Sequence, residues 1–390
     1  MSGDAVKQWE VQSSTGKHFA VLDGIRGIAI LMVVAFHTIY VNPEAGPLQQ
    51  AFMNVIQTGW MGVQVFFVLS GFLISYPLFR GRAGDSNFWY QKGYTRRRVG
   101  KILPPFYLAI ILISLAYVPG FSDPAFRNAA WQWALGLPNF IQNDVAPFNS
   151  YWSLIVEAHF YFVLPLLFFF TRGLKPASTA ALLFCVLFLV PFFVRHFTWP
   201  EPGTPKLVMS FLMNRFPGAL DFFGWGVLFA GIFVALSANH DLRALGWFGP
   251  VGLVLMAMTL GLYAFWSNTL GIHHYPQRWA VEVFHLLPGV ATFFMLFFVF
   301  DPDGGITRLL AHPALRFTGI ISYEWFLFHM PFVLTANHLI GSAQGSLMYY
   351  LLKTVVPLAL SYGFSVLVYR YFSLPLMNRI RGRMPARAKQ

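Results

Sequence analysis

Arg26 and His37 are ionisable residues in the first long apolar stretch, LDGIRGIAILMVVAFH (22–37), and their types and spacing could support chemistry. They are eleven residues apart, which in an α-helix is close to three full turns and about 16 Å of rise, so both side chains share one helix face. A neutral imidazole can take the proton of a hydroxyl, and a guanidinium binds phosphate well. Asp23, one turn before Arg26, could pair with it.

Each of these residues also has a structural interpretation. Arg26 could extend its charge to the membrane interface, and a single intramembrane histidine such as His37 is often a hydrogen bonder between helices. Two ionisable groups on one face favour a polar pathway, because such groups inside a membrane usually line a cavity.

Glu157 is the carboxylate that we predict to partner His37. It lies in YWSLIVEAHFY (151–161), a stretch that enters the membrane from outside, so we expect it at about the depth of His37. A carboxylate there could orient the imidazole ring and stabilise its cationic form, as in other acid–base pairs.

The remaining candidates lie in or at the ends of other apolar stretches. Three could donate a hydrogen bond to an oxyanion, namely Ser70, Ser153 and Tyr323. Four are supporting or acceptor-side candidates, namely Tyr151, Trp152, Glu324 and His329. Four further residues we interpret as structural hydrogen bonders, namely His159, Asp221, Glu282 and His285.

The composition indicates the elements that must position these groups. The chain has 390 residues, of which 56% are hydrophobic and 11% charged, whereas soluble domains carry about a quarter charged residues. Apolar runs of about 20 residues recur and are continuous rather than alternating, which predicts membrane-spanning helices and not a barrel. We therefore expect an all-α integral membrane protein with about ten transmembrane helices.

The predicted spans are 20–40, 59–79, 102–119, 151–171, 177–197, 217–237, 245–267, 280–300, 318–340 and 350–372. With both termini in the cytoplasm, 20 of the 27 Lys and Arg residues lie on the cytoplasmic side, as the positive-inside rule requires. The domains follow as a cytoplasmic N-terminal segment (1–19), a transmembrane domain (20–373) and a basic cytoplasmic tail (374–390) that could anchor on anionic lipid.

Several function classes lack support in the sequence. The net charge of +12 is spread over short loops, so we expect no nucleic-acid partner. We also expect no metal site, because the His spacing of H-E-x-x-H is absent. Neither a G-x-S-x-G elbow nor a Walker A motif occurs, and the single cysteine, Cys185, is interpreted as a packing residue.

A basic cluster precedes the third apolar stretch. Arg96, Arg97, Arg98 and Lys101 suit a polyanionic ligand such as a phosphate-rich co-substrate. Positive-inside topology alone would also account for them.

Five stretches together resemble the membrane-bound acyltransferase-3 family. LDGIRGIAILMVVAFH is similar to its opening motif and GVQVFFVLSGFLIS (62–75) to its second-span signature. YTRRRVGKILPPFY (94–107) resembles the basic loop, and YWSLIVEAHFYFVLPLL (151–167) and ISYEWFLFH (321–329) resemble later motifs. The resemblance covers about 20–375.

The resemblance implies a multi-pass O-acyltransferase of the bacterial inner membrane. Its expected donor is acyl-CoA, usually acetyl-CoA, and its expected acceptor is a hydroxyl of a glycan, a lipid-linked glycan or another cell-envelope or secreted molecule. It also implies that Arg26 and His37 are the functional pair. The family frame Arg-x-x-Arg reads here Arg98-Val-Gly-Lys101, in which lysine keeps the charge but not the bidentate grip.

The mechanistic hypothesis joins these residues. Donor phosphates would bind near Arg26, Arg97, Arg98 and Lys101, the thioester would reach His37, and His37 would deprotonate the acceptor hydroxyl. Some members carry an additional extracytoplasmic domain, so transfer is either direct or completed by a separate extracytoplasmic partner. The alternative function is a secondary transporter with a polar pathway at mid-membrane, which would explain the buried charges equally well.

Overall fold

The computed structural model describes residues 19–39, 46–82, 94–116, 124–137, 148–199, 215–237, 242–269, 278–340 and 347–382. Every regular element in these ranges is a helix. Eight helical segments of the described chain are long and apolar enough to cross a membrane. These findings confirm the predicted all-α membrane protein.

A long helix occupies each of the ten predicted ranges in the described part of the chain. Two of them, α10 with its 17 residues and the polar helix α15, are not among the eight apolar spans. The number of membrane crossings and the side of the termini remain predictions. The helices are α2 (Ala20–Thr38), α4 (Gly62–Arg82), α5 (Tyr94–Ala116), α7 (Trp152–Phe170), α8 (Pro176–Phe197), α10 (Leu220–Leu236), α11 (Phe248–Thr269), α12 (Arg278–Met295), α15 (Ser322–Ile340) and α16 (Leu347–Val368).

Shorter helices connect or extend the long ones. They are α3 (Pro47–Ile56), η1 (Gly59–Met61), α6 (Pro124–Ala134), η5 (Phe148–Tyr151), η6 (Arg243–Trp247), η7 (Leu296–Phe300), α13 (Gly305–Leu310), α14 (Pro313–Ile320), the π-helical turn η8 (Tyr369–Ser373) and α17 (Leu374–Gly382). The predicted C-terminal tail thus begins as a helix, and its residues 383–390, like the predicted N-terminal segment apart from Phe19, lie outside the described residues.

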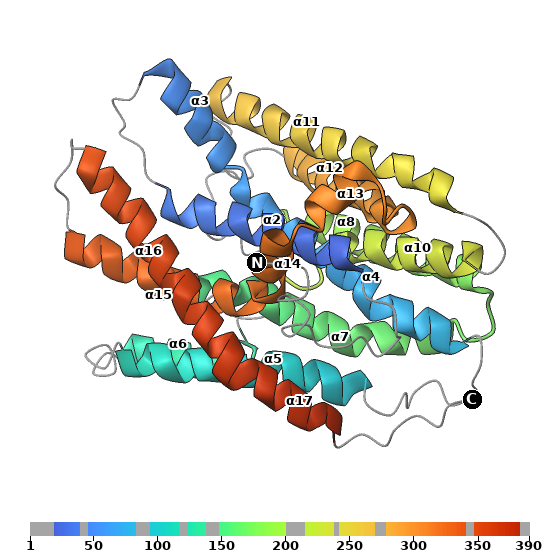
Figure 1. Cartoon of the computed structure of the whole chain (residues 1–390). Coiled ribbons are helices and arrows are strands. Elements are labelled where there is room, and N and C mark those ends of the chain that lie inside the picture. Colours follow the sequence, from blue (N-terminus) through green and yellow to red (C-terminus); the bar gives the residue numbers. More distant parts are fainter. Residues whose placement is uncertain are drawn as a thin grey trace.

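Helix α2 lies in the middle of the bundle, with α4, α10, α11 and α12 on one side and α5, α15 and α16 on the other (Figure 1). One stripe of α2 enters the larger core, which α4, α7, α8 and α10 also line. Its other stripe, Ile30, Val33 and Val34, packs in a second core with residues of α5, α6 and α15. Ile30 and Val33 share a helix face with Arg26 and His37, so Arg26 and His37 are also directed to the second core.

Helices α2 and α14 cross closely because glycines stand at the contact (Figure 1). A Cβ atom at Gly27 would meet the carbonyl oxygen of Leu315, and one at Gly319 would meet the carbonyl oxygen of Asp23. Only residues without a side chain let two helix backbones approach this far. Gly27 and Gly319 thereby let α2 pack closely against α14.

Candidate active site

Helices α2 and α15 hold the Arg26–His37 face between two polar contacts. The Arg26 Nη2 lies 3.3 Å from Ser322 Oγ, and the His37 Nδ1 lies 3.2 Å from His329 Nε2. The earlier residue of α2 contacts the earlier residue of α15, and the later one contacts the later one. The two helices therefore run in the same direction. The structure thus agrees with the expectation that Arg26 and His37 lie along one face, and it identifies α15 as the element which that face meets.

The two histidines form a polar contact between α2 and α15 near the C-terminal end of α2. Their ring centroids are 4.9 Å apart. His37 Nδ1 lies 2.9 Å from the Val33 carbonyl oxygen, and His329, which is fully buried, places its Nδ1 2.8 Å from the Phe326 carbonyl oxygen. His37 is less buried than His329 and so is the member of the pair open to a ligand.

Glu157 has different partners from the one predicted. Its Oε1 accepts hydrogen bonds from Ser70 Oγ at 2.5 Å and from Tyr161 OH at 2.6 Å. The His37 ring contacts His329 instead. The predicted pairing of Glu157 with His37 is therefore not the arrangement in the structure, which gives His37 a histidine partner.

Glu157 does not meet His37 because α7 begins at a different level along the bundle from the one predicted. The Tyr151 hydroxyl donates to the Leu327 carbonyl oxygen at 2.5 Å, so α7 starts beside a residue only two positions before His329. Glu157 is six residues further along, about 9 Å deeper. The sequence predicts that this span begins at the membrane surface, whereas Phe148 and Tyr151 of η5 are already buried in the bundle. The spacing of Glu157 and Tyr161, one helical turn apart, was the signal available for their hydrogen bond.

A second polar group surrounds Arg26 at the other end of the face. The Arg26 guanidinium lies 6.0 Å from the centroid of the Phe66 ring. The buried Glu324 interacts electrostatically with both Arg26 and Lys101. Both cations thus lie within electrostatic range of the same acidic side chain, and cations of this kind can bind an anionic ligand.

The basic cluster lies on a helix and not in a loop. Helix α5 begins at Tyr94, earlier than the predicted start at 102, because strongly polar residues hide its first turns from a hydropathy reading. The backbone of Arg97 and Arg98 belongs to α5, but their side chains lie outside the described part of the structure. In the sequence, both are within four residues of Lys101.

Two of the predicted oxyanion donors use their hydroxyl hydrogen elsewhere. Ser70 donates to Glu157, and Tyr323 donates to the Ile102 carbonyl oxygen at 2.8 Å, which ties α15 to α5. Ser153 is buried in the first turn of α7. Since a hydroxyl has one hydrogen to donate, neither Ser70 nor Tyr323 is arranged to stabilise an oxyanion.

The other predicted site residues have structural surroundings. Tyr151 is fully buried and bridges to α15, so it does not present its hydroxyl to an outer acceptor. Trp152 is half-buried and its ring lies 6.0 Å from that of Phe67. Asp23 lies where α2 crosses α14.

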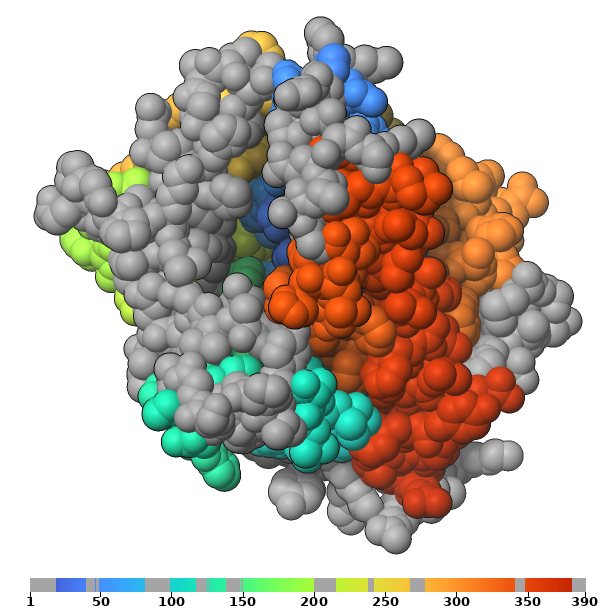
Figure 2. Space-filling model, turned by 90° about the vertical axis from the view of Figure 1, so that its left-hand side faces the viewer, coloured from blue at the N-terminus to red at the C-terminus, as the bar shows by residue number. Residues whose placement is uncertain are grey.

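A hollow leads inward at the face where α2 and α15 end. Figure 2 shows this face recessed beside the orange and red residues of α15 and α16, with dark blue residues of α2 in its depth. The hollow thus lies on the side of the bundle where the C-terminal ends of α2 and α15 meet.

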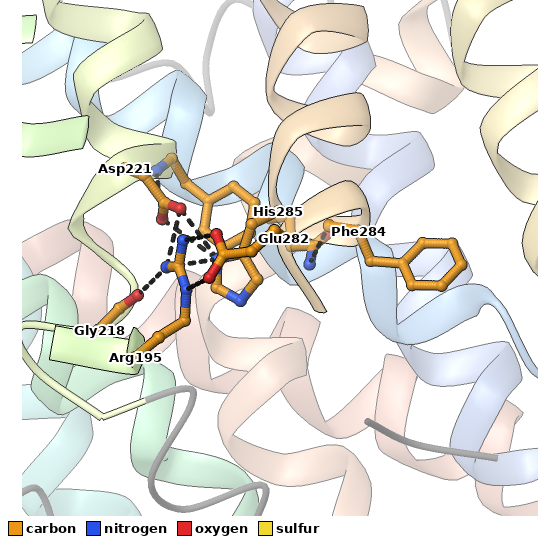
Figure 3. Close-up of polar contacts among 8 residues, drawn as sticks. Arg195, Gly218, Asp221, Glu282, Phe284 and His285 are labelled. Carbon is orange, nitrogen blue, oxygen red and sulfur yellow. Dashed lines mark hydrogen bonds and ion pairs between the residues drawn. The ribbon is translucent and has the colours of Figure 1, made fainter. Parts of the chain in front are cut away.

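A separate network of buried charges ties α8, α10 and α12 together (Figure 3). Arg195, fully buried, bonds Asp221 at 2.9 Å and Glu282 at 2.7 Å, and the His285 Nδ1 lies 3.0 Å from Asp221 Oδ2. This arrangement supports the interpretation of Asp221, Glu282 and His285 as structural. It adds Arg195, which lies near the end of the predicted span 177–197 and was not among the candidate residues. Its place in the last turn of α8, level with the starts of α10 and α12, was the signal available in the sequence.

Among the residues that the structure describes, no group of three or more His, Cys, Asp or Glu residues has the arrangement of a metal site.

Comparison with known proteins shows the family to which the chain belongs. The model of the acyltransferase-3 domain family matches residues 19–366. The O-acetyltransferase OatA of Staphylococcus aureus strain NCTC 8325 is 23% identical over 383 residues, which cover 92% of this chain and 57% of that protein. OatA of strain COL matches with the same values. The chain thus spans little more than half the length of these relatives. No solved structure matches the chain significantly. Since the family model covers nearly the whole transmembrane bundle, the chain belongs to the acyltransferase-3 family.

Proposed function

We propose that the chain is a membrane O-acyltransferase that moves an acetyl group from cytoplasmic acetyl-CoA to a hydroxyl of a cell-envelope or secreted glycan. The observation that carries this proposal is the α2–α15 face, which has cations at one end and a histidine pair about 16 Å away at the other. Membership of the acyltransferase-3 family and the O-acetyltransferase names of the relatives support the reaction class.

The donor binds through its phosphates at the Arg26 end. Arg26 and Lys101 both interact electrostatically with Glu324, which supports the proposal that they bind one anionic ligand together. Arg97 and Arg98 precede Lys101 in α5 and supply further charge. Arginine grips phosphate through paired N–H groups and lysine acts as a point charge. A pantetheine arm then carries the thioester along the face towards His37.

The acceptor reaches His37 through the hollow at the opposite face (Figure 2). His37 takes the hydroxyl proton as the acceptor oxygen attacks the thioester carbonyl carbon. The new C–O bond forms, the C–S bond breaks, and the CoA sulfur leaves with the proton from His37. Atoms and charges balance without a further reactant.

Glu157 has a different role in this proposal from the one predicted. Held by Ser70 and Tyr161, its carboxylate lies deeper than the histidine pair. It orders the polar route between donor and acceptor ends by joining α4 to α7, and it does not orient His37.

The test uses the full-length protein in lipid nanodiscs with radiolabelled acetyl-CoA and chitooligosaccharides as a model glycan acceptor. Wild-type protein is expected to bind acetyl-CoA and release CoA when the acceptor is added. His37→Ala is expected to bind acetyl-CoA normally and to lose release by at least about 100-fold, the range for a general base. Near wild-type release by His37→Ala rejects this role for His37. Failure of the wild-type protein to bind acetyl-CoA favours the transporter alternative.

A further inference from the structure

His329 has only one arrangement of its ring proton that fits its contacts. Its Nδ1 lies 2.8 Å from the Phe326 carbonyl oxygen and 3.2 Å from that of Trp325. Carbonyl oxygens only accept hydrogen bonds, so this nitrogen must carry a hydrogen. In the neutral imidazole the other nitrogen, Nε2, then carries a lone pair. Complete burial of the ring favours the neutral form.

The same reasoning applies to His37. Its Nδ1 lies 2.9 Å from the Val33 carbonyl oxygen and therefore donates. It also lies 3.2 Å from His329 Nε2, the nitrogen with the lone pair. One hydrogen shared between two acceptors in this way is a common three-centre bond. Two independent acceptors thus select one tautomer of His37, in which Nε2 is the unprotonated nitrogen.

We infer that His329 is a positioning residue for His37, keeping the His37 Nε2 lone pair directed to the acceptor hydroxyl. This inference rests on the proposed function. In the Ser-His-Asp triad a carboxylate has this task, because it holds the imidazole in the tautomer that can accept a proton. Here the task falls to a neutral ring, for which burial inside a membrane costs less than for an unpaired carboxylate.

The proton balance of the reaction is unchanged by His329. The acceptor proton moves to His37 Nε2, while the Nδ1 hydrogen stays shared between Val33 and His329. The imidazolium form of His37 then donates a stronger, charge-assisted hydrogen bond to His329 Nε2. When the proton leaves with the CoA sulfur, both rings return to their starting state.

Two substitutions of His329 separate positioning from packing. His329→Leu fills the space without an acceptor, whereas His329→Gln can place its amide oxygen near the position of the imidazole Nε2. We expect His329→Leu to lower kcat about 10- to 100-fold, the range for residues that orient a reactive ligand, with the KM for acetyl-CoA unchanged. His329→Gln is expected to recover most of that loss.

Ser361→Ala is the matched control. The Ser361 hydroxyl, also fully buried, accepts a hydrogen bond from Trp325 Nε1 at 3.0 Å, so its removal perturbs the same helix, one turn away. This variant is expected to keep the wild-type kcat. A loss in Ser361→Ala equal to that of His329→Leu, or His329→Gln no more active than His329→Leu, overturns the inference.

A spectroscopic measurement does not depend on any variant being active. Nuclear magnetic resonance of the wild-type protein with ring-nitrogen-labelled histidine, assigned by comparison with His37→Ala, reports which nitrogen of His37 is protonated. The inference requires a protonated Nδ1 and an unprotonated Nε2, and the opposite tautomer overturns it. Loss of the proposed function itself would instead appear as wild-type protein that does not bind acetyl-CoA, or as an active His37→Ala.

Discussion

The Arg195 guanidinium meets the Glu282 carboxylate side-on, with Nε 3.1 Å from Oε1 and Nη2 2.7 Å from Oε2. The same guanidinium donates to Asp221 and to the Gly218 carbonyl oxygen. Because these groups belong to or adjoin three helices, one side chain fixes the spacing of α8, α10 and α12 (Figure 3). The larger core of the bundle is therefore held by charge as well as by apolar packing.

Replacing Arg195 with Met should destabilise the fold strongly. The change leaves the buried Asp221 carboxylate without its cation, which costs about 3–5 kcal/mol when one partner of a buried pair is removed. Thermal unfolding of the detergent-purified protein measures the loss. Arg278→Met is the control, because that arginine lies at the start of α12 in an exposed hydrogen bond to the His196 carbonyl oxygen. Equal unfolding temperatures for the two variants would show that the Arg195 network contributes no more than a surface contact.

Adding a single methyl group at Gly27 should also destabilise the bundle. The new Cβ atom would collide with the Leu315 backbone carbonyl, which cannot rotate away as a flexible side chain can. We expect Gly27→Ala to cost at least about 1–3 kcal/mol, the usual range for overpacking. Gly261→Ala is the matched control, since a Cβ there has no neighbour within 4 Å and alanine is the better helix former. A stable Gly27→Ala variant would mean that α2 and α14 can separate freely.

The sequence predicts the helices well, but it predicts poorly how they are positioned along the bundle relative to one another. Continuous apolar runs locate the long helices, and the eleven-residue spacing correctly places Arg26 and His37 on one face. The start of α7 is different, because η5 enters the bundle before the apolar run begins, and hydropathy carries no information about that. Glu157 consequently lies deeper than predicted.

Pairings between distant segments were also outside the reach of the sequence. His37 and His329 are 292 residues apart, and nothing in either motif specifies that their rings meet. Arg195 illustrates the same limit, since a residue near the predicted end of a span reads as a surface charge until the neighbouring helices are placed around it. Both contacts depend on helix packing, which periodicity within one helix does not determine.

The orientation of the bundle can be tested through the single cysteine. Cys185 is replaced by Ala, and new cysteines are introduced one at a time at Lys175 and at Arg278, which begin α8 and α12. With both termini in the cytoplasm, a membrane-impermeant maleimide applied to intact cells should label Arg278→Cys and not Lys175→Cys. The reverse pattern would invert the assignment of donor and acceptor sides.

Glu324 provides the sharpest test of the donor site, because its removal should improve binding. The carboxylate competes with any anionic ligand for Arg26 and Lys101. Glu324→Gln keeps the shape of the side chain but removes that competition, so the KM for acetyl-CoA should fall several-fold. Arg26→Gln should raise it by about tenfold or more, as expected for losing a hydrogen bond to a charged group. Both changes in KM should become smaller at high salt, since part of the effect is electrostatic.

The control is a third variant, Arg172→Gln. It removes an arginine that stacks on Phe169 between α7 and α8, and it should leave the KM for acetyl-CoA unchanged. A higher KM in Glu324→Gln would contradict the assignment and would indicate that the carboxylate instead holds Arg26 and Lys101 in the positions that the donor requires.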